Sequence, residues 1–209
     1  MVATTAPGSF QYVPLWPFAS QQEADRWLRD DAPNGHLPWH AEEDTTALYF
    51  TQNYLGFTEI NQTTNVTTKG NEAWVSVGYE LPNLKVMTAA TIHLARFGTA
   101  SDAPWEVVDT QDNMLTVTAP AYGSTVGPVI EARGTITGTD ENLELQVRQS
   151  TQQKVVGDFC CLPIGGQNSP WSAQVTTTGT QSGVLTVVVW TGGHAQNVET
   201  FAITGVRTA

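Results

Sequence analysis

Histidine and carboxylate side chains gather at one place in the chain. The segment Gly35-His-Leu-Pro-Trp-His40 is followed directly by the acidic residues Glu42, Glu43 and Asp44. Imidazole and carboxylate groups are common zinc ligands, but Pro38 opposes the helical turn that would place His36 and His40 on one face. We therefore predict no metal and no cofactor here, and interpret the carboxylates as favourable charges near a helix start. The loop that contains His36, Trp39 and His40 is a candidate ligand-binding feature.

A second group of chemically capable side chains lies on predicted strands. His93 lies in mid-strand between two apolar residues, and Trp74 falls on the corresponding face of an alternating segment. A pocket lined by Trp74, Tyr79 and His93, or by their strand neighbours, would make the N-terminal half a ligand-binding or enzymatic domain. Nucleophilic catalysis is not indicated, because the chain has no G-x-S-x-G turn and His93 and His194 fall in different predicted domains.

The two cysteines, Cys160 and Cys161, are adjacent. Neighbouring strand residues point to opposite faces, so a direct cross-link between them is geometrically demanding. Three interpretations follow: two partly buried thiols, a vicinal disulfide in an oxidising compartment, or a redox or metal role.

The elements that position these residues differ between the two halves of the chain. Ser20 and Glu23 fit a capping box and predict a helix start, and Asp44 and Gly56 predict the ends of a second helix. Alternating apolar residues predict strands from residue 72, over 86–97 and over 105–108. Two helices on an antiparallel sheet form an α+β layer arrangement.

The order of these elements has a family resemblance. A helix with Ala47 and Phe50, a strand ending in Leu94-Ala-Arg96 and the closing Pro104-Trp-Glu-Val-Val108 resemble the cone-shaped cystatin-like or nuclear-transport-factor-like domains. The resemblance covers roughly residues 20–110. It implies a space between helix and sheet that serves enzymes in some relatives and ligand binding or assembly in others.

The C-terminal half shows strand periodicity only. Seven short strands are predicted in about 95 residues, the number expected of an immunoglobulin-like sandwich; they cover 115–117, 129–136, 143–149, 155–161, 171–177, 184–190 and 201–206. The nearly continuous apolar run at 184–190 predicts a central strand.

Particular residues of this half carry a second resemblance. The turn Pro120-Ala-Tyr-Gly-Ser124, the glycine Gly134 and the late Pro170-Trp171 resemble the immunoglobulin-like domain of bacterial spore germination proteins. The Cys160-Cys161-Leu-Pro-Ile-Gly-Gly segment departs from that pattern. The resemblance implies an extracytoplasmic module, often beside another small domain, with no known catalysis.

Composition limits the partners. The 209-residue chain has a net charge of −11 and no cluster of lysine or arginine, so it lacks the electrostatic footprint of a nucleic-acid binder. It has no window of about 20 apolar residues and its start is not a signal peptide. We predict an extracytoplasmic protein, secreted or lipid-anchored, which touches a membrane only through an anchor upstream of this chain.

These observations predict an α+β N-terminal domain followed by an all-β immunoglobulin-like sandwich. The predicted boundaries are an extended segment over 1–19, the cone-like domain over 20–112 and the sandwich over 113–209. The leading hypothesis is a non-catalytic binding or structural module of the bacterial cell envelope, which contacts a protein, a cell-wall component or a small ligand. A carbohydrate-binding module is an alternative, because exposed tryptophans stack on sugar rings; the candidates are Trp16, Trp39, Trp171 and Trp190.

Overall fold

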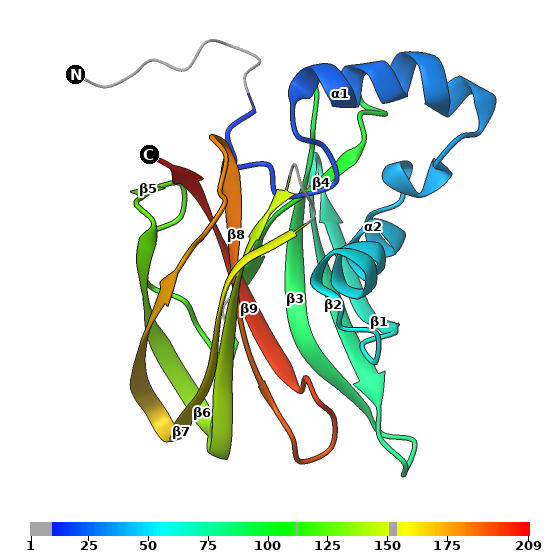
Figure 1. Ribbon diagram of the computed structural model, residues 1–209. Helices are drawn as coiled ribbons and strands as arrows, with labels where there is room; N and C mark the ends of the chain where they lie inside the picture. Colours follow the sequence, from blue (N-terminus) through cyan, green and yellow to red (C-terminus); the bar gives the residue numbers. More distant parts are fainter. Residues whose placement is uncertain (1–9, 112, 151–153) are drawn as a thin grey trace.

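A computed structural model describes residues 10–111, 113–150 and 154–209. The chain forms two β-sheets side by side, with its helical segments packed against the first (Figure 1). The helical segments are α1 (Gln21–Arg26), η1 (Trp27–Asp31), η2 (Ala32–Asn34), η3 (Pro38–Ala41), α2 (Glu43–Tyr49) and η4 (Phe50–Leu55). The strands are β1 (Gln62–Lys69), β2 (Glu72–Glu80), β3 (Val86–Arg96), β4 (Trp105–Gln111), β5 (Thr125–Val126), β6 (Val129–Gln149), β7 (Lys154–Thr176), β8 (Val184–Gly192) and β9 (Thr200–Thr208).

The helix signals of the sequence are largely confirmed. The Ser20 side chain accepts a hydrogen bond from the Glu23 amide at the start of α1, as the capping box predicts. Gly56 ends the second helical segment with φ = 86°, the left-handed conformation that glycine adopts at little cost. The predicted N-cap Asp44 is wrong by two residues, because α2 begins after Glu42, whose side chain makes no capping bond.

The first sheet, sheet A, has the order β1-β2-β3-β4 and is antiparallel throughout. The strands β2, β3 and β4 confirm the three strands predicted from alternation. Strand β1 was not predicted because its residues, QTTNVTTK, show no apolar alternation. It forms the edge of the sheet, and its side chains are exposed or half-buried, so no buried face imposes a pattern on them.

The second sheet, sheet B, has the order β5-β9-β8-β6-β7. Four of the predicted short strands are in fact parts of two long ones: β6 contains 129–136 and 143–149, and β7 contains 155–161 and most of 171–177. Register shifts interrupt the β6–β7 pairing at several points, so the two strands bend together. The two arms of this bent pair close over one core, in which Ile130 and Trp171 of one arm join Leu145 of the other.

A close approach explains the glycine in the middle of β6. A Cβ built on Gly134 would lie only 1.8 Å from the Thr116 carbonyl oxygen. The predicted strand at 115–117 runs here as a short bridge, Leu115 to Ile136, rather than as a full strand. Only glycine leaves room for this backbone contact.

The two sheets share one hydrophobic core. Strands β8 and β9 are apolar on both faces: Val189 and Ala202 point into sheet B's own core, whereas Trp190 and Phe201 pack with the residues of sheet A and its helices. Thr110 of β4 accepts a hydrogen bond from the Ile203 amide at 2.9 Å and joins the sheets directly. The central position predicted for the 184–190 strand is therefore confirmed. Its residues are nearly all apolar because both faces of the strand are buried.

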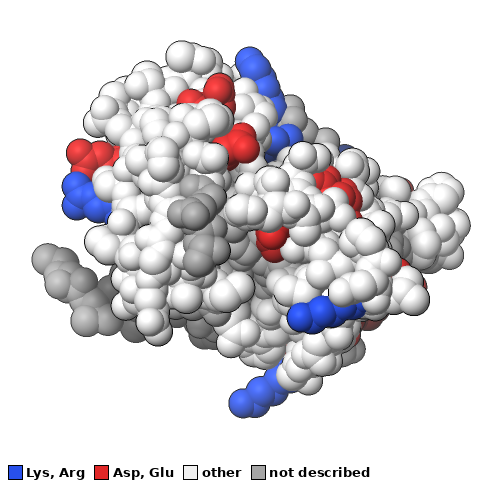
Figure 2. Space-filling view, turned by 90° about the horizontal axis from the view of Figure 1, so that it is seen from below, with Lys and Arg blue, Asp and Glu red and all other residues white. Residues whose placement is uncertain are grey.

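The surface carries few charges. On the face drawn in Figure 2, lysine and arginine side chains lie at scattered points and uncharged side chains cover most of the area. Within the described residues, no helix is long and apolar enough to cross a membrane.

Candidate functional site

The space between helices and sheet A is filled with side chains rather than open. Phe50 and Tyr54 on the helical side pack against Val75 and Ile92 of the sheet, and all four are buried. Tyr79 belongs to this core as well and is only 3% exposed. Tyr79 thus packs on the face of sheet A opposite to Trp74 and His93, and the predicted grouping of these three residues is wrong.

The outer face of sheet A brings Trp74 and His93 together, as their shared strand face predicts. Trp74 on β2 and His93 on β3 are directly opposite in the antiparallel register. Their rings are stacked with an interplanar angle of 2° and a centroid separation of 5.0 Å. Tyr12, from the segment before α1, lies nearly perpendicular to the His93 ring, and the two ring centroids are 5.3 Å apart.

Glu72 connects these groups. Its Oε1 accepts a hydrogen bond of 2.7 Å from the Tyr12 hydroxyl, and its Oε2 lies 3.5 Å from His93 Nε2. Glu72 is at the start of β2, two residues before Trp74 and therefore on the same face. Tyr12, Glu72, Trp74 and His93 form one contiguous group, which we call the outer-face cluster.

The electrostatics of the cluster follow from these contacts. The hydrogen bond to Glu72, together with burial, raises the pKa of Tyr12 to about 12. Burial lowers the pKa of His93, and the neighbouring Glu72 carboxylate opposes this change in part. His93 is therefore neutral at pH 7. The neighbours of the Glu72 carboxylate are thus the Tyr12 phenol and a neutral imidazole rather than a cation.

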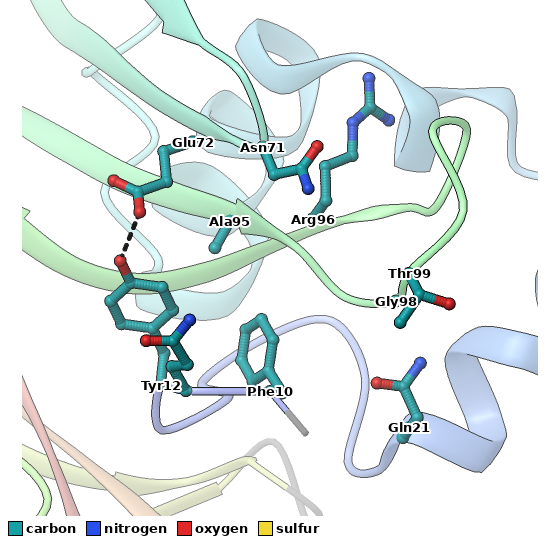
Figure 3. Close-up of a pocket in the computed structure, with 10 residues that line it drawn as sticks. Phe10, Tyr12, Gln21, Asn71, Glu72, Ala95, Arg96, Gly98 and Thr99 are labelled. Atoms are coloured by element: carbon teal, nitrogen blue, oxygen red, sulfur yellow. Dashed lines mark hydrogen bonds between the residues drawn. The ribbon is translucent and has the colours of Figure 1, made fainter. Parts of the chain in front are cut away.

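A cavity of about 360 Å³ adjoins the cluster at Tyr12 and Glu72. Figure 3 shows it between the segment that carries Phe10 and Tyr12, the β2–β3 pair, and the Gly98–Thr99 bend. The walls come from four parts of the chain and are mixed in character: Phe10, Gln11, Tyr12, Gln21, Asn71, Glu72, Ala95, Arg96, Gly98 and Thr99. Its size is at the lower end of the range for ligand pockets, about 300–1,000 Å³.

A larger hollow lies along the first helix. It measures about 540 Å³ and is lined by Ser20 and five residues of α1 and η1. Because all its walls belong to one helical segment, it is an open flank of that segment and cannot enclose a ligand.

The loop at 36–40 packs on the helical side of sheet A, away from the outer-face cluster. His36 is exposed and lies 3.9 Å from Asp31. His40 is buried against Phe18, Trp27 and Trp39, and burial lowers its pKa to about 4. Trp39 is half-buried and stacks on Trp16. In the part of the chain that the structure describes, no three potential metal ligands come together.

The tryptophans proposed for sugar stacking are mostly inaccessible. Trp16, Trp171 and Trp190 are buried, and Trp39 uses one ring face on Trp16. The expectation that these four form an exposed surface is therefore wrong. Trp16, Trp171 and Trp190 are buried because large aromatic side chains fill the spaces within and between the layers of the fold.

The cysteines form a vicinal disulfide between Cys160 and Cys161. The pair lies on β7 at a register shift of the β6–β7 ladder, and both residues are exposed, so the expected burial of the thiols is wrong. Cys161 has φ = 87°, which departs from the extended backbone of a regular strand. The β-bulge thus removes the strict alternation that makes such a cross-link demanding.

Sequence reasoning missed Tyr12, Glu72 and a further acidic residue, Glu106. Tyr12 and Glu72 are 60 positions apart, and no local spacing connects them. Glu106 is fully buried on β4, and its Oε2 accepts a hydrogen bond of 3.0 Å from the Phe18 amide. A signal for Glu106 was present in the sequence, because it is the one charged residue within the apolar run Pro104-Trp-Glu-Val-Val108.

No protein-family model and no curated protein matches this chain.

Proposed function

We propose that the chain is a non-catalytic binding module that holds a small polar ligand in the cavity beside Tyr12 and Glu72. The observation that carries this proposal is the cavity itself, about 360 Å³ in volume, with polar groups from separate elements converging on it. A sheet that is hydrogen-bonded along its length gives two of these walls, which favours a preformed site. The remaining walls come from the segment with Phe10 and Tyr12, from α1 and from the Gly98–Thr99 bend (Figure 3).

Binding is favoured over catalysis by what faces the cavity. His93, the imidazole of the cluster, is not among the residues that line it. The described lining contains no serine or cysteine, and no histidine of the lining stands ready to activate its two hydroxyl groups, those of Tyr12 and Thr99. An enzymatic role would have to use the Glu72 carboxylate as its base, since it is the one carboxylate in the described lining, and it is already hydrogen-bonded to Tyr12.

The proposed location is extracytoplasmic, as a secreted or lipid-anchored component of the bacterial cell envelope. The disulfide between Cys160 and Cys161 supports it, because disulfides persist in oxidising compartments and are rare in the cytosol. A cell-wall component or another envelope protein is then the source of the ligand.

The fold assignment is proposed on the same basis. The curled sheet B, with Trp171 in its core and the turn at Pro120, supports an immunoglobulin-like sandwich over residues 113–209. The helices α1 and α2 on four-stranded sheet A support the cone-like description of 20–112.

The test is NMR mapping with four small probes: 1,5-pentanediol, 1,5-diaminopentane, glutarate and N-acetylglucosamine. We expect at least one probe to shift the side-chain amide signals of Gln21 and Asn71, which line the cavity. Thr99→Trp fills the mouth of the cavity and should abolish these shifts, whereas the control Ser101→Trp, in the same exposed loop, should keep them. If no probe moves these signals, the proposal is wrong.

A further inference from the structure

The charge of the cavity walls is unbalanced. Glu72 contributes a carboxylate, and its contacts are the Tyr12 hydroxyl and His93 Nε2. Lys69 is opposite Glu72 in the β1–β2 register, yet no lysine or arginine forms an ion pair with Glu72 among residues 10–111, 113–150 and 154–209. A partly buried carboxylate without a cationic partner attracts a positive charge from outside.

The only cationic residue in the described lining is turned away from the cavity. Figure 3 shows the Arg96 side chain on the opposite side of β3 from Ala95, which faces the cavity. The Arg96 Nη1 donates to the Ala103 carbonyl oxygen at 2.6 Å, and the guanidinium carbon lies 4.1 Å from the Trp105 ring centroid. These two contacts hold the Arg96 guanidinium on the other face of the sheet. It therefore neither neutralises Glu72 nor is placed to bind an anion in the cavity.

The remaining walls suit a cation as well. Gln21 uses its side-chain nitrogen to donate to Phe97 O and Asp25 Oδ1, both at 2.9 Å. Its amide oxygen is thereby left to accept, and it points toward the cavity in Figure 3. The rings of Phe10 and Tyr12 add two aromatic groups, whose π-systems attract cations.

We infer that the cavity takes an alkylammonium group, with Glu72 as its counter-ion, the Phe10 ring beside its methylene chain and Gln21 Oε1 as an acceptor at the opposite end of the cavity. This inference rests on the proposed function, since it names the ligand class of the same cavity. A primary amine at the end of a short aliphatic chain fits both the polar end of the cavity at Glu72 and its apolar wall at Ala95 and Phe10. An anion would meet an uncompensated carboxylate.

The experiment compares three of the probes, which have the same five-carbon chain and different end groups. 1,5-Diaminopentane is cationic, 1,5-pentanediol is neutral and glutarate is anionic. Dissociation constants are measured from the side-chain amide shifts of Gln21 and Asn71 at low and high salt. We expect the diamine to bind about tenfold more tightly than the diol, the magnitude of one partly solvated charge-assisted hydrogen bond. Added salt should weaken diamine binding.

Two variants complete the test. Glu72→Gln keeps the acceptor for Tyr12 and removes the charge, and it should abolish the preference for the diamine. The control Glu80→Gln removes an exposed carboxylate at the far end of the same strand and should leave the preference intact.

The outcomes separate the two proposals. Equal binding of diol and diamine at the cavity, or a preference that survives Glu72→Gln, overturns the alkylammonium inference and leaves the binding function standing. Binding of glutarate in preference to the diamine also overturns the inference. A complete absence of shifts from every probe overturns both.

Discussion

Replacement of Glu106 by glutamine tests the strongest electrostatic feature of the fold. Glu106 is fully buried on β4, where its Oε2 accepts a hydrogen bond from the Phe18 amide and its Oε1 has no hydrogen-bond partner in the described structure. Burial raises the pKa of this carboxyl well above its ordinary value of 4.5, because the charged form would lose its hydration. Glutamine has the same shape, keeps the acceptor for Phe18 and cannot ionise.

The sign and size of the effect follow from proton linkage. Between pH 4.5 and the raised folded-state pKa, the unfolded chain ionises Glu106 whereas the folded protein keeps it protonated. Unfolding therefore releases one proton, and the free energy of unfolding falls by about 1.4 kcal/mol per pH unit from this group alone. The contribution is complete below pH 4.5 and is lost as the pH rises toward the folded-state pKa. Glu106→Gln should therefore gain stability relative to the wild type as the pH rises above 4.5.

The assay is urea unfolding of both proteins at pH 5, 6 and 7. All other titrating groups contribute equally to both, so the difference in free energy of unfolding isolates Glu106. We expect that difference to grow with pH in favour of the variant, by about 1.4 kcal/mol per pH unit while the pH stays below the folded-state pKa of Glu106. Parallel curves would show that Glu106 is ionised in the folded protein, and the burial argument would then be refuted.

Three further predictions concern the shared core, the outer-face cluster and the disulfide. Phe201→Ala should lower the free energy of unfolding by about 3–5 kcal/mol. Because the Phe201 ring belongs to the core common to both sheets, tryptophan fluorescence and far-UV circular dichroism should report one coincident unfolding transition. Separate transitions would contradict this. Glu72→Gln should lower the pKa of His93 further in an NMR titration of the imidazole Cε1–H, since the Glu72 charge raises that pKa; an increase would contradict the assigned contact. Replacement of Cys160 and Cys161 by serine should cost only about 1 kcal/mol in urea unfolding, because the disulfide closes a loop of two residues; a loss several times larger would contradict the loop-entropy argument.

Local patterns in the sequence predicted strands and helix ends correctly where a buried face requires apolar residues at regular intervals. The alternation in β2 and the apolar run of β8 correspond to strands, and the Ser20 capping box and Gly56 mark helix ends. Strand β1 escaped prediction because an exposed edge strand imposes no apolar pattern. The joining of predicted strands into β6 and β7 also escaped, because polar bulged segments inside a bent strand resemble turns.

The site was predictable only in part. Period-two alternation placed Trp74 and His93 on one face, and the structure stacks them. The same alternation places Tyr79 on the opposite face, so a pocket that contains all three side chains is inconsistent with the strand pattern. Tyr12 was out of reach, because its contact with Glu72 depends on how the segment before α1 crosses the sheet, which is a tertiary feature without a local spacing.

The position of β9 has a consequence for how the protein is made. This strand is the last of the described strands, and its two faces complete two different cores, with Phe201 and Ile203 on one side and Ala202 and Val206 on the other. A nascent chain from which β9 has not yet emerged therefore has both cores open at once and exposes apolar surface in each half. Truncation before β9 should yield a product recognised by chaperones and proteases rather than a folded fragment, so both halves of the fold depend on residues Thr200–Thr208.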